Sequence, residues 1–145
     1  MSENFHVTGL NHLAVWSLSE AERGRRLREA AEVGAVEEVR ALLAAGADVV
    51  ARGEVGGLTA LHWAALNGHA AVVRLLLSAA SDPNARTQGG RTPLHFAALN
   101  GHTEAAAALL QAGADRGATD KDGDTPLDIA REENHQQLVQ MLTQR

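Results

Sequence analysis

The sequence contains no cysteine among its 145 residues. Disulfide bonds, a thiolate nucleophile and a cysteine-ligated zinc site are therefore all excluded. No apolar run approaches the ~18 residues that a membrane-spanning helix requires, and residues 1–18 lack the basic start of a signal peptide. We therefore expect a cytoplasmic protein without a membrane segment.

Basic and aromatic residues are also scarce. Lysine and arginine together number 13, against 18 aspartate and glutamate residues, and the formal net charge is −5. Aromatic side chains make up 3% of the chain, so the sequence offers no basic face interleaved with aromatics for nucleic acid. The length is that of one domain, which can bury roughly two thirds of its unfolded surface.

What the chain does contain is a stretch that occurs twice. Residues 59–69 read TALHWAALNGH and residues 92–102 read TPLHFAALNGH, 33 positions later, with only two differences. The same offset leads on to residues 125–130, which read TPLDIA. Upstream, residues 27–34 (LREAAEVG) align with residues 61–68 at an offset of 34. A fixed period of this size indicates a repeat architecture.

A second feature recurs after each leucine pair, at residues 46–48 (GAD), 80–82 (ASD) and 113–115 (GAD). Together the two motifs resemble the ankyrin repeat, and the resemblance covers about residues 20–145. It implies an all-α solenoid of stacked helix pairs with short hairpin fingers. We expect an N-terminal apolar arm and one repeat domain, the first and last repeats resembling capping repeats. The boundaries are residues 1–18 for the arm and 19–145 for the domain, with repeats at about 19–51, 52–85, 86–118 and 119–145.

Capping signals predict where the first helices begin and end. Ser19 and Glu22 form a capping box, which should start a helix that runs to about Glu32. The second helix is expected from Val36 to Ala45, and Gly46 then closes it in the left-handed conformation.

Threonine stands at the expected N-cap of the first helix in each later repeat, at positions 59, 92 and 125. His62 and His95 follow three residues after two of these caps, within reach of the threonine hydroxyl. We interpret both as structural hydrogen-bonding residues. The alternative, catalysis or metal binding, is weaker because their spacing follows the repeat and not a ligand geometry. His69 and His102 are expected to start the second helix of their repeats.

Three features of the repeats stand out, and the first two are departures from the family pattern. The finger 52–58 is one residue longer than its counterpart and rich in glycine, and we expect it to be mobile. Ala80 occupies the position of Gly46 and Gly113. The second helix of the third repeat, residues 105–110, has alanine where residues 72–77 have larger side chains, among them the predicted inward stripe of Val73, Leu76 and Leu77.

Residues 1–18 are too apolar for a free tail, and two interpretations stay open. The arm either packs over the open face of the first repeat or serves as a docking peptide. A third hypothesis arises because residues 7–15 resemble the opening strand of glyoxalase-like metalloenzymes, in which the histidine, here His12, binds a metal. That resemblance covers about ten residues, and the other strands and ligands of such a fold are missing.

The acidic run 120–124 could be mistaken for a calcium loop. An EF-hand loop needs glycine at its sixth position and glutamate at its twelfth, where this chain has Thr125 and Arg131. We therefore expect an ordinary acidic finger. No serine, histidine and acid stand together at positions that suit catalysis, so the sequence predicts no enzyme, no metal and no cofactor.

The family resemblance implies a non-enzymatic protein-protein interaction module that acts through its concave face. Position in the motif directs Glu29, Trp63, Phe96 and Ile129 toward that face, with a leucine and an asparagine one helical turn on. Aromatic and arginine residues ringed by polar groups are typical of an interface core. The predicted protein-binding residues are Trp63, Phe96, Leu66, Leu99, Asn67, Asn100, Leu58, Arg52, Arg86, Gln88 and Arg91.

The sequence does not identify the partner, but the arginines suggest a protein segment with acidic groups beside an apolar anchor. We expect a monomer. The alternatives are that Trp63 and Phe96 merely stiffen their own fingers, that the chain is a small regulatory or scaffold subunit docking through the arm, and that the segment around His12 is the remnant of a metalloenzyme.

Overall fold

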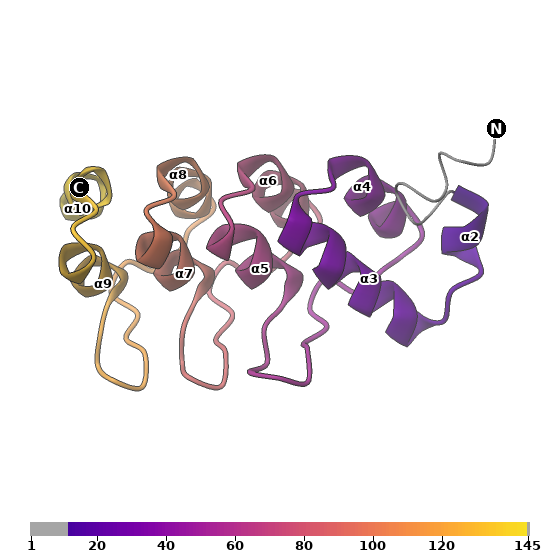
Figure 1. Ribbon diagram of the computed structural model, residues 1–145, viewed down its shortest axis with the longest axis horizontal. Coiled ribbons are helices and arrows are strands. Elements are labelled where there is room, and N and C mark those ends of the chain that lie inside the picture. Colours follow the sequence, from indigo (N-terminus) through magenta and orange to yellow (C-terminus); the bar gives the residue numbers. More distant parts are fainter. Residues whose placement is uncertain (1–11, 145) are drawn as a thin grey trace.

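A computed structural model describes residues 12–144 of the chain, with side chains from residue 14 onward. These residues are all-helical, with no strand among them, as the sequence predicts. The helices stack in two rows, and the loops before α5, α7 and α9 project together on one side (Figure 1). One row contains α3 (Glu20–Val33), α5 (Ala60–Leu66), α7 (Pro93–Asn100) and α9 (Pro126–Glu132), and the other contains α4 (Val36–Ala44), α6 (Ala70–Ser78), α8 (Thr103–Gln111) and α10 (Gln136–Thr143), with α2 (His12–Trp16) at the end beside α4.

Side-chain caps start the first helix of each pair, as the sequence predicts. The Ser19 hydroxyl accepts a hydrogen bond from the backbone N–H of Glu22, and the Glu22 carboxylate accepts from that of Ser19. Thr59, Thr92 and Thr125 cap α5, α7 and α9 in the same reciprocal way. Each cap satisfies N–H groups that have no partner within the helix.

The core lies between the two rows. Equivalent leucines of the first row, Leu27, Leu61 and Leu94, are at most 1% exposed. Buried alanines on α5 and α7 leave room for these helices to lie side by side. On α6 the fully buried residues are Val72, Val73 and Leu76. The predicted inward stripe is confirmed for Val73 and Leu76, and Leu77 packs against the core while staying partly exposed.

The turn between paired helices is closed by a glycine on which the next pair's histidine ring rests. Gly68 has φ +75°, and a Cβ built on it would lie 2.5 Å from Nδ1 of His102. His69 approaches Gly34 and His135 approaches Gly101 in the same way. A side chain at these glycines would meet the ring as well as the strained backbone angle. The histidines precede the helices as N-cap residues, in agreement with their predicted place.

The described end of the N-terminal segment forms a short helix, α2. Residues His12–Trp16 are helical, so the predicted likeness to a metalloenzyme strand is wrong for that part, and residues 1–11 lie outside the described part of the chain. Val15 is fully buried and belongs to the hydrophobic core, in agreement with an arm packed on the first helix pair. Trp16, in contrast, is 58% exposed. Across residues 12–144, no helix combines the length and apolarity that a membrane span requires.

Ala80 adopts the left-handed conformation that its place in the motif predicts, with φ 71°. We expect Ala80→Gly to raise the free energy of unfolding by about 1 kcal/mol, because glycine adopts this angle without a Cβ clash. Gly113→Ala is the matched control: its φ is +94° and nothing lies within 4 Å of the added Cβ, so it should be destabilising by a similar amount. Urea unfolding measures both, and a neutral Ala80→Gly contradicts the prediction.

The alanine-rich helix α8 buries Ala105, Ala106 and Ala108, where α6 has the fully buried Val72 and Val73 and the partly buried Leu75. Each missing methylene forgoes ~0.8 kcal/mol of burial. We therefore predict faster amide hydrogen exchange in residues 105–110 than in residues 72–77, measured by mass spectrometry on the native protein. Equal or slower exchange in α8 would mean that closer helix packing compensates for the lost volume.

Candidate functional site

Trp63 and Phe96 occupy the same motif position on α5 and α7, which pack side by side. Both side chains are partly buried and retain some exposure. Their counterparts differ: Glu29 on α3 is exposed, and Ile129 on α9 is 4% exposed and belongs to the core. The row of equivalent positions is therefore apolar and accessible only in its middle.

Phe96 also has a structural contact. Its ring meets the His62 ring edge to face, with centroids 5.7 Å apart and an interplanar angle of 88°. The contact joins α7 to α5, so Phe96 packs on the preceding helix pair. Trp63 packs against the core with part of its surface. Both aromatics thus combine a packing role with an exposed portion.

One helical turn beyond the aromatics, each helix has a leucine followed by an asparagine, and the two residue types differ in burial. Leu66 and Leu99 are partly buried, and the asparagines are exposed. The side-chain amide of Asn67 donates to the carbonyl of Trp63 (3.1 Å), and that of Asn100 donates to the carbonyl of Leu66 (2.7 Å). The second bond crosses from α7 to α5. Polar groups therefore border the aromatics at the helix ends.

The arginines that the sequence assigns to the binding surface are engaged within the fingers, defined as residues 52–58, 86–91 and 119–124. Nη1 of Arg52 donates to the carbonyls of Gly57 (2.9 Å) and Arg86 (2.6 Å). Arg86 donates in turn to the carbonyl of Thr119 (2.8 Å), and Nε of Arg91 lies 3.4 Å from Oδ2 of Asp120. Each guanidinium links one finger to the next.

Backbone hydrogen bonds join the fingers as well. The N–H of Gln88 donates to the carbonyl of Gly56, and that of Lys121 donates to Gly89, both at 2.9 Å. The first finger is closed by a bond from Gly53 N–H to the Leu58 carbonyl (2.9 Å). Leu58 is partly buried and the Gln88 side chain is exposed. The predicted mobility of the first finger stays a prediction.

His62 and His95 are completely buried, and hydrogen bonds occupy both nitrogens of each ring. The N–H of Thr59 donates to Nδ1 of His62 (2.9 Å), so Nε2 carries the proton and donates to the carbonyl of Ala85 (2.8 Å). His95 repeats this with Thr92 and Asp124. Burial lowers the pKa of His62 to about 4, and burial likewise lowers the pKa of His95. No lone pair is free for a metal, which agrees with their predicted structural role.

Comparison with known proteins decides the family. A model described as "Ankyrin repeats (3 copies)" matches residues 11–87, and one described as "Ankyrin repeats (many copies)" matches residues 78–130. The chain belongs to the ankyrin repeat family. Members of this family are generally protein-protein interaction modules without catalytic activity.

Curated relatives are similar in sequence to about half of this ankyrin repeat chain. Human "Ankyrin repeat domain-containing protein 40" is 43% identical over 70 residues, which are 48% of this chain and 19% of that protein. The bovine "Mitochondrial disaggregase" is 46% identical over 69 residues, which are 48% of this chain and 10% of that protein. The matched stretch thus spans a fifth or less of these relatives.

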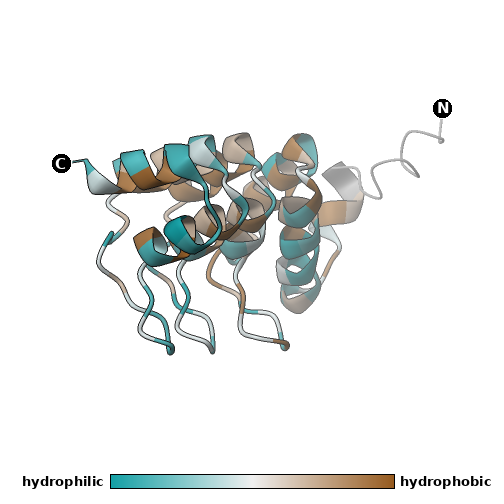
Figure 2. Ribbon diagram, turned by 60° about the vertical axis from the view of Figure 1, so that its left-hand side comes forward, coloured by the Kyte–Doolittle hydropathy of each residue, from teal (hydrophilic) through white to brown (hydrophobic). Residues whose placement is uncertain are grey.

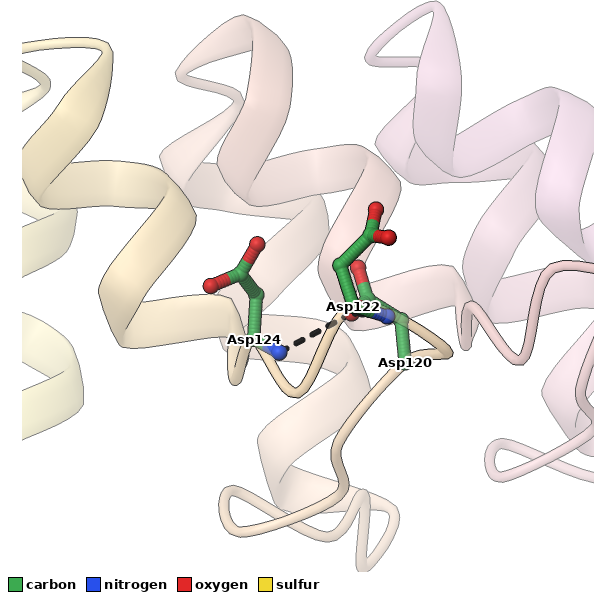
Figure 3. Close-up of side chains that lie close together, drawn as sticks. All are labelled: Asp120, Asp122 and Asp124. Atoms are coloured by element: carbon green, nitrogen blue, oxygen red, sulfur yellow. Dashed lines mark hydrogen bonds between the residues drawn. The ribbon is translucent and has the colours of Figure 1, made fainter.

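The acidic finger of this ankyrin repeat chain holds three carboxylates whose oxygens lie within 4.8 Å of one another, on Asp120, Asp122 and Asp124. Oδ1 of Asp120 accepts the backbone N–H groups of Asp122 (3.0 Å) and Asp124 (2.9 Å; Figure 3). Burial raises the pKa of Asp120, but these N–H groups outweigh it, and the net pKa lies below the usual range. Because Oδ2 pairs with Arg91, this carboxylate is already engaged, and the cluster fits the predicted acidic finger.

The lowered pKa of His62 predicts a pH dependence of stability. Its pKa is 6.5 in the unfolded chain and about 4 in the folded one, so the unfolded chain binds more protons between these values. The free energy of unfolding should be highest above pH 6.5 and should fall by about 3 kcal/mol as the pH drops to 4. Urea unfolding across this range tests the prediction, and His62→Gln should flatten the dependence. The same slope in both proteins would mean that another group is responsible.

Proposed function

We propose that this chain binds a partner protein through the surface formed by the first-row helices and the fingers, with Trp63 and Phe96 as its anchors. The observation that carries the proposal is their partial exposure at equivalent positions of two adjacent helices. Aromatic side chains of this kind dominate the binding energy of many interfaces. Family membership supports the coarse function, an interaction module. We propose that the repeats lie at about residues 19–51, 52–85, 86–118 and 119–145.

The hydrogen bonds between fingers support this proposal. Arg52 and Arg86 link three fingers through backbone carbonyls, and these bonds favour one arrangement of the loops beside the anchors. A preorganised surface loses less conformational entropy on binding. Asn67, Asn100 and Gln88 supply an exposed polar rim. We propose a partner segment with an apolar anchor and acidic groups, and a cytoplasmic, monomeric protein.

A second candidate surface is the helix α2, because Trp16 is 58% exposed beside the buried Val15. In this alternative the chain is a small regulatory or scaffold subunit that docks through its N-terminal arm. Deleting the whole arm would remove Val15 from the core and confuse folding with binding. A single substitution of Trp16 separates the two.

Partner capture with three proteins tests the proposal: wild type, the double variant Trp63→Ala/Phe96→Ala, and Trp16→Ala as the matched aromatic control. We expect wild type and Trp16→Ala to retain the same partner from lysate. The double variant should lose it, because truncating an interface aromatic typically costs ~2 kcal/mol or more. Thermal melting should show all three folded, with a modest shift in the double variant because Phe96 also packs on His62.

The opposite pattern, with capture lost only in Trp16→Ala, would move the binding site to the arm. If instead the double variant unfolds, the aromatics are core residues and the proposed anchors are wrong.

A further inference from the structure

A cavity with a volume of about 520 Å³ lies between the first turns of α3 and the first finger. It is lined by charged side chains that include Glu20, Arg25, Arg28, Asp48, Arg52 and Glu54. Arg52 also belongs to the finger network, so the cavity is continuous with the proposed binding surface.

The cavity exists because α3 is longer than its counterparts. It has 14 residues, against seven or eight in α5, α7 and α9, and its extra turns extend toward the first finger. Gly24 permits this approach: a Cβ built there would lie 3.2 Å from the Cβ of Ala51. The helix is mostly hydrophilic (Figure 2). It therefore forms a charged wall at the N-terminal end of the finger row.

Arg28 takes the motif position of His62 and His95, 34 residues before the first of them. His62 closes the base of the next finger through its Nε2, whereas the Arg28 side chain reaches over Gly53, with Nε 3.5 Å from a Cβ built on that glycine. The Arg28 side chain is partly buried. Within residues 12–144 it has no hydrogen bond and no ion pair.

Two other cations of the cavity and one of its carboxylates already have partners. Arg25 pairs with Glu29 at 2.9 Å, and Nη1 of Arg52 donates to two carbonyls. The Asp48 carboxylate accepts the N–H of Val50. A guanidinium presents up to five donors in a planar fork that matches a carboxylate. Arg28 is thus a partly buried cation whose side-chain donors have no protein partner within the described part of the chain.

We propose that this cavity binds a single carboxylate side chain of the partner segment, with Arg28 as the pairing residue. The exposed acids Glu20 and Glu54 at the same cavity would repel a run of acidic residues. The preferred segment therefore carries one aspartate or glutamate beside a lysine or arginine. This inference rests on the proposed function, and it specifies the chemistry at one end of the same surface.

The test uses random 12-residue peptides displayed on phage and selected on the intact chain. We expect the selected peptides to share an apolar anchor and one acidic residue next to a basic one. A synthetic peptide of this set should bind Arg28→Gln about tenfold to a hundredfold more weakly than wild type. Arg25→Gln is the matched control in the same cavity and should bind within about threefold of wild type. Arg28→Lys, which keeps the charge without the fork, should fall between.

A second peptide, with its acidic residue replaced by the corresponding amide, shows whether the peptide carboxylate pairs with the Arg28 guanidinium. It should bind wild type weakly, and Arg28→Gln should weaken it no further. Equal losses from Arg28→Gln with both peptides would overturn the pairing. Because the Arg28 side chain has no partner within residues 12–144, its variants should melt within about 2 °C of wild type.

The outcomes separate this inference from the proposed function. Peptides that need Trp63 and Phe96 but show no acidic preference, and that bind Arg28→Gln normally, overturn the carboxylate site and leave the function standing. Peptides that need Arg28 but tolerate loss of both aromatics support the site and contradict the anchors. A library that yields no binder to wild type counts against both.

Discussion

The stacking of this chain depends on one hydrogen-bonded unit, the threonine and histidine that open α5 and α7. In α5 the Thr59 hydroxyl and the Nδ1 atom of His62 satisfy each other's backbone N–H groups, and Nε2 then donates to the carbonyl of Ala85 at the base of the second finger. A local cap is thereby converted into a link between successive helix pairs. Because the ring is completely buried, an unpaired nitrogen would carry a full desolvation penalty, so the finger must close on the ring for the unit to be stable.

The ends of the row show what happens when this unit changes. In α9, Asp128 replaces the histidine and still completes the cap, and the N–H and hydroxyl of Thr125 lower the pKa of its carboxyl. An aspartate is too short to reach a further finger. In α3 the cap lies nine residues before Arg28, so the arginine at the histidine position is not needed for the helix start. The Arg28 side chain instead lines the cavity between α3 and the first finger.

Much of the local structure could be predicted from the sequence, because caps and turns depend on residues three or four apart. The capping boxes at Ser19 and Thr59 and the positive φ of Ala80 are of this kind. The complete burial of Val72, which the predicted stripe left out, and the engagement of Arg52 and Arg86 depend instead on which surface the neighbouring element covers. The cavity beside Arg28 also lay beyond sequence reasoning: the capping box predicts the length of α3, but the close approach of α3 to Ala51 at Gly24 depends on tertiary packing.

The residues that join the helix pairs differ from those that are available to determine binding specificity. At His62 and His95 both ring nitrogens are already used: Nδ1 accepts within the helix's own cap, and Nε2 donates to the base of the next finger. A partner could engage them only by breaking the stack. The residues that differ between helix pairs are Trp63 and Phe96, where α3 has Glu29, and Arg28, which stands at the histidine position. Within residues 12–144 the two aromatics keep exposed surface, and Arg28 keeps donors without a partner. In a solenoid whose shared residues are committed to stacking, discrimination between partners must come from the residues in which the repeats differ.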